Sequence, residues 1–276
     1  MIDCKKSIVH QDALEILIEA LNSNGMSLEK HMVENSIFIC PYKVKKQMED
    51  LENLLKSRQT DQTEPHEDLV ADNSKLPVRY STDRKNVIYK PGTGITDCKA
   101  GYTVSMANNI YTEIHSGAAP SSVVWPSAGY VVDYKDIPVV IDRDNNYFVR
   151  AAVSQYTGHI VSQGASNTLI NYTISHIWPY TADPFYFTSL WNIVLIPAHC
   201  NYIMDKGAST HPVVRSIQEL FRAICYLLYD PNSYLTTFEN ILKKSNPNIL
   251  IPRVAEPSQT ALTLAQIYID NGLIFI

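Results

Sequence analysis

The residues best suited to chemistry are one histidine and two asparagines that lie close together in the chain: His176, Asn192 and Asn201. A neutral imidazole can accept a proton near physiological pH, because the unperturbed pKa of histidine is about 6.5. An amide oxygen is a hard ligand that suits Mg²⁺. A base next to a divalent cation is the combination that hydrolysis of a phosphodiester needs.

Three short elements must position these side chains. Residues 172–178 are rich in β-branched and aromatic side chains and precede Pro179, which predicts a strand. Residues 193–196 form an apolar run that predicts a buried strand ended by Pro197. We expect a helix over 198–206 with Pro197 as its first residue, because a missing N–H costs nothing there. A hairpin that packs on a helix can bring three polar side chains to one point.

This stretch resembles the HNH endonuclease family, also called the ββα-metal nucleases. Ser175 to Pro179 matches the family's Asp-His-Ile-x-Pro, with Ser in place of the usual Asp. Asn192 to Ile196 matches Asn-Leu-x-x-Leu. Asn201, with Asp205-Lys206 behind it, matches the closing His or Asn ahead of a Lys. The resemblance covers residues 171–206.

The resemblance implies an endonuclease that hydrolyses DNA phosphodiester bonds with Mg²⁺ or Mn²⁺. In this interpretation His176 activates water, and Asn192 holds the element that carries the base by bonding its backbone. Asn201 binds the metal, together with Ser175. The resemblance also suggests a setting in restriction or phage defence, which is an analogy at the level of the family.

The serine leaves several alternatives, because Ser175 offers a hydroxyl where the family has a carboxylate. Another acid could supply the charge, and Asp183 and Asp205 are the nearest in sequence. Phosphate oxygens could instead complete the metal's shell. A third alternative is a catalytically degenerate HNH-like scaffold that binds nucleic acid or a protein. A weaker one is a metal-free RNase that uses His159 and His176.

The charge balance limits the nucleic-acid hypothesis. The net charge is −5, and residues 151–212 contain a single Lys and no Arg, whereas phosphate contacts rely on those cations. Arg215 and Arg222, or a basic segment between residues 75 and 90, would have to compensate. That segment interleaves cations with two tyrosines and is the predicted nucleic-acid contact. Its cations are Lys75, Arg79, Arg84, Lys85 and Lys90. Such a nuclease fits a homodimer or a complex with a defence partner.

The cysteines and the apolar runs indicate a compartment. Five cysteines are scattered without a CxxC pair, which predicts neither a disulfide framework nor a structural zinc site. The first residues lack the pattern of a signal peptide, and no apolar run approaches the length that spans a membrane. We therefore expect a cytoplasmic protein.

The remaining pattern predicts an α+β fold, in which an embedded ββα-metal hairpin–helix element has a β-rich region before it and helices at both ends. We divide the chain into an N-terminal helical region (1–58), a polar linker or mobile loop (59–75), a β-rich core (76–212) and a C-terminal helical region (213–276).

Shorter patterns within these regions predict individual elements. The predicted strands before the hairpin are 121–125, 129–133, 137–141 and 147–153. Three N-terminal helices are predicted. The first ends at Asn24-Gly25, the second begins after Ser27, and the third covers 44–57. The predicted C-terminal helices are 213–229, 233–244 and 258–271. The apolar residues 273–276 should pack on the body of the protein or on a partner subunit.

Overall fold

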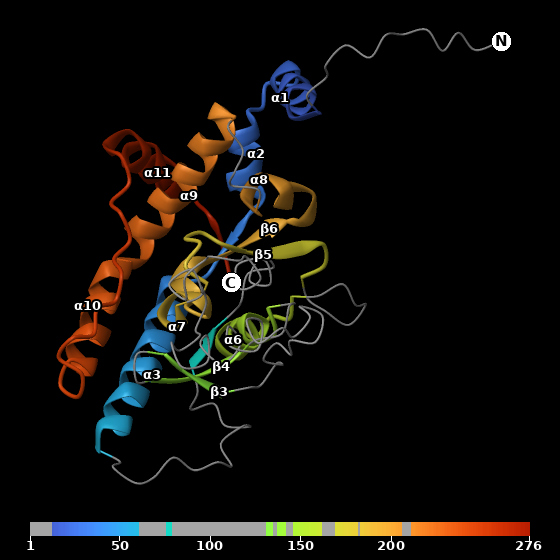
Figure 1. Cartoon of the computed structure of the whole chain (residues 1–276). Helices are drawn as coiled ribbons and strands as arrows, with labels where there is room; N and C mark the ends of the chain where they lie inside the picture. The colour runs from blue at the N-terminus through green and yellow to red at the C-terminus, as the bar shows by residue number, and fades with distance from the viewer. Residues whose placement is uncertain are drawn as a thin grey trace, which may run out of the picture.

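The computed structural model describes residues 13–60, 76–78, 131–134, 137–141, 146–161, 169–181, 183–205 and 211–276. Within these ranges the protein is a mixed α+β fold, with mostly helices and a small four-stranded sheet (Figure 1). No helix in the described ranges is long and apolar enough to cross a lipid bilayer.

The four-stranded sheet joins distant parts of the chain. Its order is β5 (Tyr172–His176), β6 (Ile193–Pro197), β1 (Ile37–Phe38) and β7 (Ile274–Phe275). Strand β6 is antiparallel to both β5 and β1, and β7 is parallel to β1. All five residues of β6 are buried, as expected for a central strand that is covered on both faces.

The N-terminal helices agree with the sequence patterns. They are α1 (Ala13–Ser23), α2 (Leu28–Asn35) and α3 (Pro41–Thr60). Gly25 has a φ of +71°, which allows the turn that follows α1. The side chain of Ser27 accepts a hydrogen bond from the Lys30 backbone N–H and so caps α2.

The C-terminal helices were also predicted within a few residues of their ends. They are α9 (Pro212–Tyr229), α10 (Pro231–Leu242) and α11 (Gln259–Asn271). Helix α11 packs along α9 (Figure 1), and Ser258 caps its start by accepting from the Ala261 N–H. Gln218 of α9 donates to the Ile203 carbonyl at 3.0 Å.

A second sheet has the order β2 (Leu76–Val78), β4 (Ile137–Ile141) and β3 (Val131–Tyr134), and its last two strands fall near predicted ranges. The predicted strand 121–125 lies outside the described residues.

The prediction of a strand over 147–153 is wrong, because this segment is the helix α6 (Tyr147–Thr157). Val149 and Val153 are four positions apart and both fully buried, so a helix brings them to one face.

The prediction that residues 273–276 pack on the body is confirmed by hydrogen bonds to the neighbouring strand. The Ile276 N–H donates to the Phe38 carbonyl, and the Cys40 N–H donates to the Ile276 carbonyl. The side chains of Ile274 and Phe275 nevertheless remain 47% and 40% exposed. The backbone of this strand is therefore paired while part of its apolar surface faces outward.

Candidate functional site

The strand–strand–helix order predicted around the three polar residues is present. Strands β5 and β6 pair antiparallel, and β6 leads through the 3₁₀ helix η5 (Ala198–Cys200) into α8 (Asn201–Asp205), which packs on β5. Pro197 was predicted to begin the helix, and this is wrong. Its ψ is 134°, so it is the last residue of β6, and the helical turn begins one residue later.

Asn192 holds the loop between the two strands. It is fully buried, and its Oδ1 accepts from the Trp178 N–H at 2.7 Å. Its Nδ2 donates to the carbonyls of Trp178 at 3.1 Å and Tyr186 at 3.0 Å. The Ile177 N–H donates to the backbone carbonyl of Asn192 at 3.0 Å. One amide therefore fixes both sides of the loop, which is the kind of backbone contact that the family resemblance implied.

His176 is the last residue of β5 and is partly exposed. Its Nε2 lies 2.9 Å from the Phe187 carbonyl oxygen, and the two rings stack with centroids 5.5 Å apart. A carbonyl oxygen only accepts hydrogen bonds, so Nε2 carries the hydrogen. In the neutral ring Nδ1 then carries the lone pair that can take a proton.

An arginine lies next to this end of the hairpin. The Arg222 Nε donates to the Ile177 carbonyl at 3.4 Å, and its Nη1 is 4.0 Å from the Glu219 carboxylate. The side chain is about one-third exposed, so its charge remains accessible. The sequence singled out Arg222 only as one of several cations that could compensate for the acidic balance.

Ser175 and Asn201 share an unusual property. Ser175 is 1% exposed, and among the described residues neither its Oγ nor the buried Oδ1 of Asn201 has a hydrogen-bond partner. Buried polar atoms without a partner are rare and cost about 1–3 kcal/mol each. Both atoms are oxygens, the donor type that Mg²⁺ prefers, so each is a suitable ligand for an oxygen-coordinated cation.

The structure brings His176 and Asn192 to one end of the hairpin, whereas α8 begins at the other end. His176 pairs with Ile193, while Tyr172 pairs with Pro197, from which the chain turns into η5 and α8. Consecutive strand residues point to opposite faces, so Ser175 and His176 do not share a face of β5. The packing of α8 on β5 is the contact that brings Asn201 back towards the strand.

The acids considered for the metal are not equivalent. Asp183 is buried, and its Oδ1 accepts from the Phe185 N–H at 2.9 Å, which caps α7 (Pro184–Phe187). This carboxylate therefore has a structural role at the start of α7. The side chain of Asp205 lies outside the described residues.

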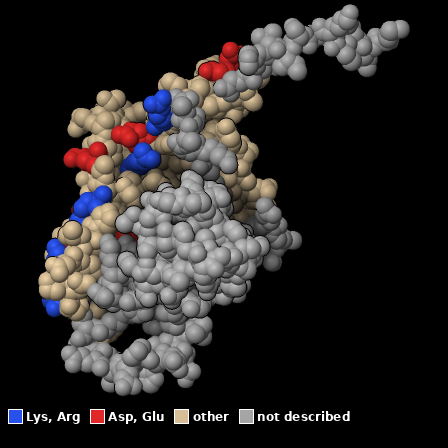
Figure 2. Space-filling model, in the orientation of Figure 1, with Lys and Arg blue, Asp and Glu red and all other residues tan. Residues whose placement is uncertain are grey.

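The predicted nucleic-acid contact also lies outside the described residues, namely Lys75, Arg79, Arg84, Lys85 and Lys90. In the part that the structure describes, several basic side chains form ion pairs with acidic side chains four residues away on the same helix. Such exposed pairs contribute little to stability. On the face shown, Figure 2 has no extended patch of basic side chains among the described residues.

Sequence reasoning missed a second group of possible ligands. His31 of α2 faces His199 of η5 with their Nε2 atoms 3.3 Å apart, and Cys200 lies beside them. His199 is exposed. No sequence signal points to His31, because 168 positions separate it from His199.

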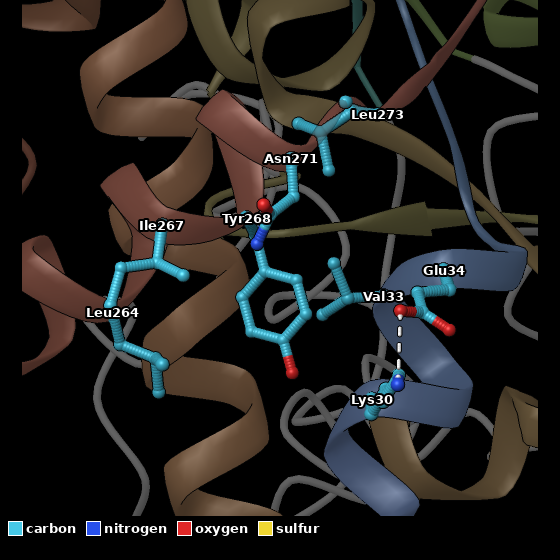
Figure 3. Close-up of a pocket in the computed structure, with 9 residues that line it drawn as sticks. Lys30, Val33, Glu34, Leu264, Ile267, Tyr268, Asn271 and Leu273 are labelled. Carbon is cyan, nitrogen blue, oxygen red and sulfur yellow. Dashed lines mark ion pairs between the residues drawn. The ribbon is translucent and has the colours of Figure 1, made fainter.

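A groove of about 290 Å³ lies between α2 and α11 (Figure 3). Tyr268 stands in its middle, and its hydroxyl donates to the Glu29 carboxylate at 3.1 Å. The Lys30–Glu34 ion pair lines one side. The lining contains no His or Cys, and the volume is at the low end for ligand pockets.

Comparison with known proteins places the chain in a family. The family model described as Uncharacterised protein PM1201 matches residues 39–260. The chain belongs to the PM1201 family. The matched range includes β5, β6 and α8 and excludes α2.

Within the PM1201 family, the chain is similar to Uncharacterized protein PM1201 of Pasteurella multocida (strain Pm70). The two are 25% identical over 113 residues, which is 38% of this chain and 48% of that protein. The chain therefore spans about half the length of the curated relative it matches. No solved structure matches the chain.

Proposed function

We propose that the protein is a metal-dependent endonuclease that hydrolyses DNA phosphodiester bonds, with β5, β6 and α8 as a ββα-metal site. The observation that supports this most is the arrangement at the end of β5. His176 has its Nε2 held by the Phe187 carbonyl, and Asn192 holds the backbone of the loop beside it. A histidine with a fixed ring and tautomer is what a general base requires.

In this proposal His176 takes a proton from water at Nδ1, while the hydrogen bond from Nε2 to Phe187 keeps the ring plane in place. Arg222 offers its guanidinium to a phosphate oxygen next to Ile177, because arginine suits planar recognition of phosphate. Asn192 does not touch the substrate in this scheme. It positions the loop that supplies the Phe187 carbonyl.

Asn201 Oδ1 and Ser175 Oγ would hold the cation, because both are buried oxygens without a partner among the described residues. Ser175 lies on the face of β5 opposite His176, so the proposal requires the DNA to reach both faces of this strand. When bound, Mg²⁺ or Mn²⁺ supplies positive charge that stabilises the phosphate as negative charge develops on it. Both protein donors are neutral, so binding depends on oxygens of the DNA phosphate to complete the shell. We extend the proposal to restriction or phage defence by analogy with the resembling family alone.

A second candidate function is a non-catalytic HNH-like module that binds nucleic acid or a protein. The position of Asp183 favours it, because the nearest described carboxylate caps α7 instead of supplementing the neutral donors. In that case His176 and Asn192 keep the loop folded without performing chemistry.

The decisive experiment incubates supercoiled plasmid with the protein in Mg²⁺ or Mn²⁺ and compares wild type with His176→Ala. Removing a general base should lower the cleavage rate by about 10²–10⁴-fold. His159→Ala is the matched control, because His159 follows α6 and is not part of β5, β6 or α8. This variant should cleave DNA at the wild-type rate. Equal cleavage by His176→Ala would remove the proposed base, and no cleavage by wild type in either metal would favour the binding module.

Asn201 tests the proposed metal contact separately. Asn201→Ala should raise the Mg²⁺ concentration needed for half-maximal cleavage by at least roughly 10- to 100-fold, the loss that an outer-shell partner causes, because it removes a ligand. Asn201→Asp keeps an oxygen and adds charge, so it should restore or lower that concentration. The same Mg²⁺ dependence in all three proteins would exclude Asn201 as a ligand.

A further inference from the structure

Two imidazoles and a thiol meet where α2 contacts the turn that precedes α8. His31 comes from α2, and His199 and Cys200 come from η5. One nitrogen from each ring and the Cys200 Sγ all lie within 4.8 Å of one another. The ring centroids are 5.6 Å apart with an interplanar angle of 45°, so the rings meet through their nitrogens and not by stacking.

The spacing agrees with the geometry of a tetrahedral metal site. Zn–N bonds of about 2.0–2.1 Å and Zn–S bonds of about 2.3 Å put two nitrogens about 3.3 Å apart, and a nitrogen and a sulfur about 3.6 Å apart. The His31 and His199 nitrogens are already 3.3 Å apart. The sulfur lies within 4.8 Å, so a shift of no more than about 1.2 Å completes the set.

We propose that His31, His199 and Cys200 form a zinc site, with solvent as the fourth ligand. Imidazole and thiolate together select zinc over Mg²⁺, which takes oxygen ligands. His199 is exposed, which leaves room for the solvent ligand, while Cys200 is buried beneath it. The proposal does not rest on nuclease activity and uses no residue of the proposed cleavage site. It also replaces the expectation, based on the absence of CxxC pairs, that the protein has no structural zinc.

Zinc binding requires two local changes. The Asn35 Nδ2 lies 3.5 Å from the His31 Nδ1, and this contact is lost when Nδ1 carries the hydrogen and Nε2 binds zinc. Asn35 keeps its shorter bond to the His31 carbonyl, at 2.7 Å, so little is lost. Burial raises the pKa of the Cys200 thiol, and zinc must displace that proton.

The consequence for the fold is a cross-link between segments that are far apart in sequence. Zinc would tie α2 to η5, and the residue that follows Cys200 is Asn201. The metal therefore fixes where α8 begins and where the Asn201 amide lies. We infer that the zinc positions α8, and with solvent as the fourth ligand its coordination is open, unlike that of closed structural zinc sites.

The test titrates the metal-free protein with Zn²⁺ by calorimetry and with Co²⁺ by absorption, because Co²⁺ reports a thiolate ligand through a charge-transfer band. We expect one equivalent bound and a thiolate band that Cys200→Ser abolishes. His31→Ala and His199→Ala should each weaken zinc binding by more than roughly 100-fold, beyond the loss that outer-shell partners cause. Cys40→Ser and His159→Ala are matched controls that should bind as wild type does.

Melting curves give a second readout, the stabilisation of the fold by zinc. Zinc at about 100 times its dissociation constant should raise the melting temperature of wild type by roughly 5 °C, and that of Cys200→Ser by much less. Zinc binding that survives all three substitutions, or a Co²⁺ complex without a thiolate band, would overturn the proposal. His176→Ala separates the two sites, because it should abolish cleavage and leave zinc binding intact.

Discussion

Two sets of polar groups around the β5–β6 hairpin differ in how they are satisfied. At the end that carries His176, the Asn192 side chain makes three hydrogen bonds to the backbone and the Nε2 of His176 has a carbonyl partner. By contrast, Ser175 Oγ in β5 and Asn201 Oδ1 at the start of α8 are buried and, among the described residues, have no partner.

We therefore distinguish the Asn192 hydrogen bonds, which hold the loop, from the two oxygens without a partner, for which we propose ligand binding. A fully satisfied polar network stabilises one conformation, whereas a buried oxygen without a partner destabilises the empty protein until a ligand reaches it. Proteins that otherwise satisfy their polar groups tend to break the rule at functional positions. The Asn192 side chain therefore contributes to stability, whereas ligand binding by Ser175 and Asn201 is the role that we propose for them.

The largest effect should come from removing the three hydrogen bonds of the Asn192 side chain. Asn192→Ala removes three hydrogen bonds and leaves the backbone groups of Trp178 and Tyr186 unsatisfied. We expect the free energy of unfolding in urea to fall by about 3–5 kcal/mol. Asn35→Ala is the control, since Asn35 also bonds a backbone carbonyl but is exposed, and it should cost less than about 0.5 kcal/mol. Equal losses in the two variants would contradict the proposal that the Asn192 side chain holds the loop between β5 and β6.

The sequence predicted the elements of the hairpin because their signals are local. A β-branched run before Pro179 and an apolar run before Pro197 were sufficient for both strands. The same reasoning failed at α6, where Tyr147, Phe148 and Val149 favour strands by propensity. The helix forms there because burial of Val149 together with Val153 outweighs that preference.

The contacts of the site could not be predicted to the same extent. The identity of Asn192 was visible, but its partners depend on how the loop folds back at Trp178 and Tyr186. The pairing of His31 with His199 depends on how α2 packs against the sheet, which no pattern within either segment records. Local propensity determines the elements, and long-range packing determines which atoms meet.

A smaller effect should follow from removing the cation beside His176. Arg222→Ala should weaken DNA binding by about tenfold and lower the slope of log affinity against log salt by about one, as expected for one lost phosphate contact. Lys244→Ala, at an exposed position just after α10, should leave that slope unchanged. Fluorescence anisotropy at several salt concentrations measures both variants. If the two variants have the same slope, Arg222 does not contact phosphate.

The smallest expected effect is a change in the free energy of unfolding that is opposite in sign to that of Asn192→Ala. Ser175→Ala removes a buried hydroxyl without a partner among the described residues, so the free energy of unfolding should rise by about 1 kcal/mol. Ser189→Ala is the matched control, because Ser189 is equally buried and its Oγ donates to the Phe185 carbonyl at 2.8 Å. It should lose about 1 kcal/mol in the same urea measurement. A loss in both variants would show that Ser175 is satisfied.

The strand order of the main sheet has a consequence for how the protein is made. The partners of β1 are β6 and β7, and most of the chain separates β1 from β7. During synthesis β1 therefore leaves the ribosome long before either partner exists, whereas β5 and β6 can pair soon after they emerge. Contacts of such long range slow folding and leave an unpaired edge that can associate with other chains. We expect nascent chains to depend on chaperones until β7 pairs with β1.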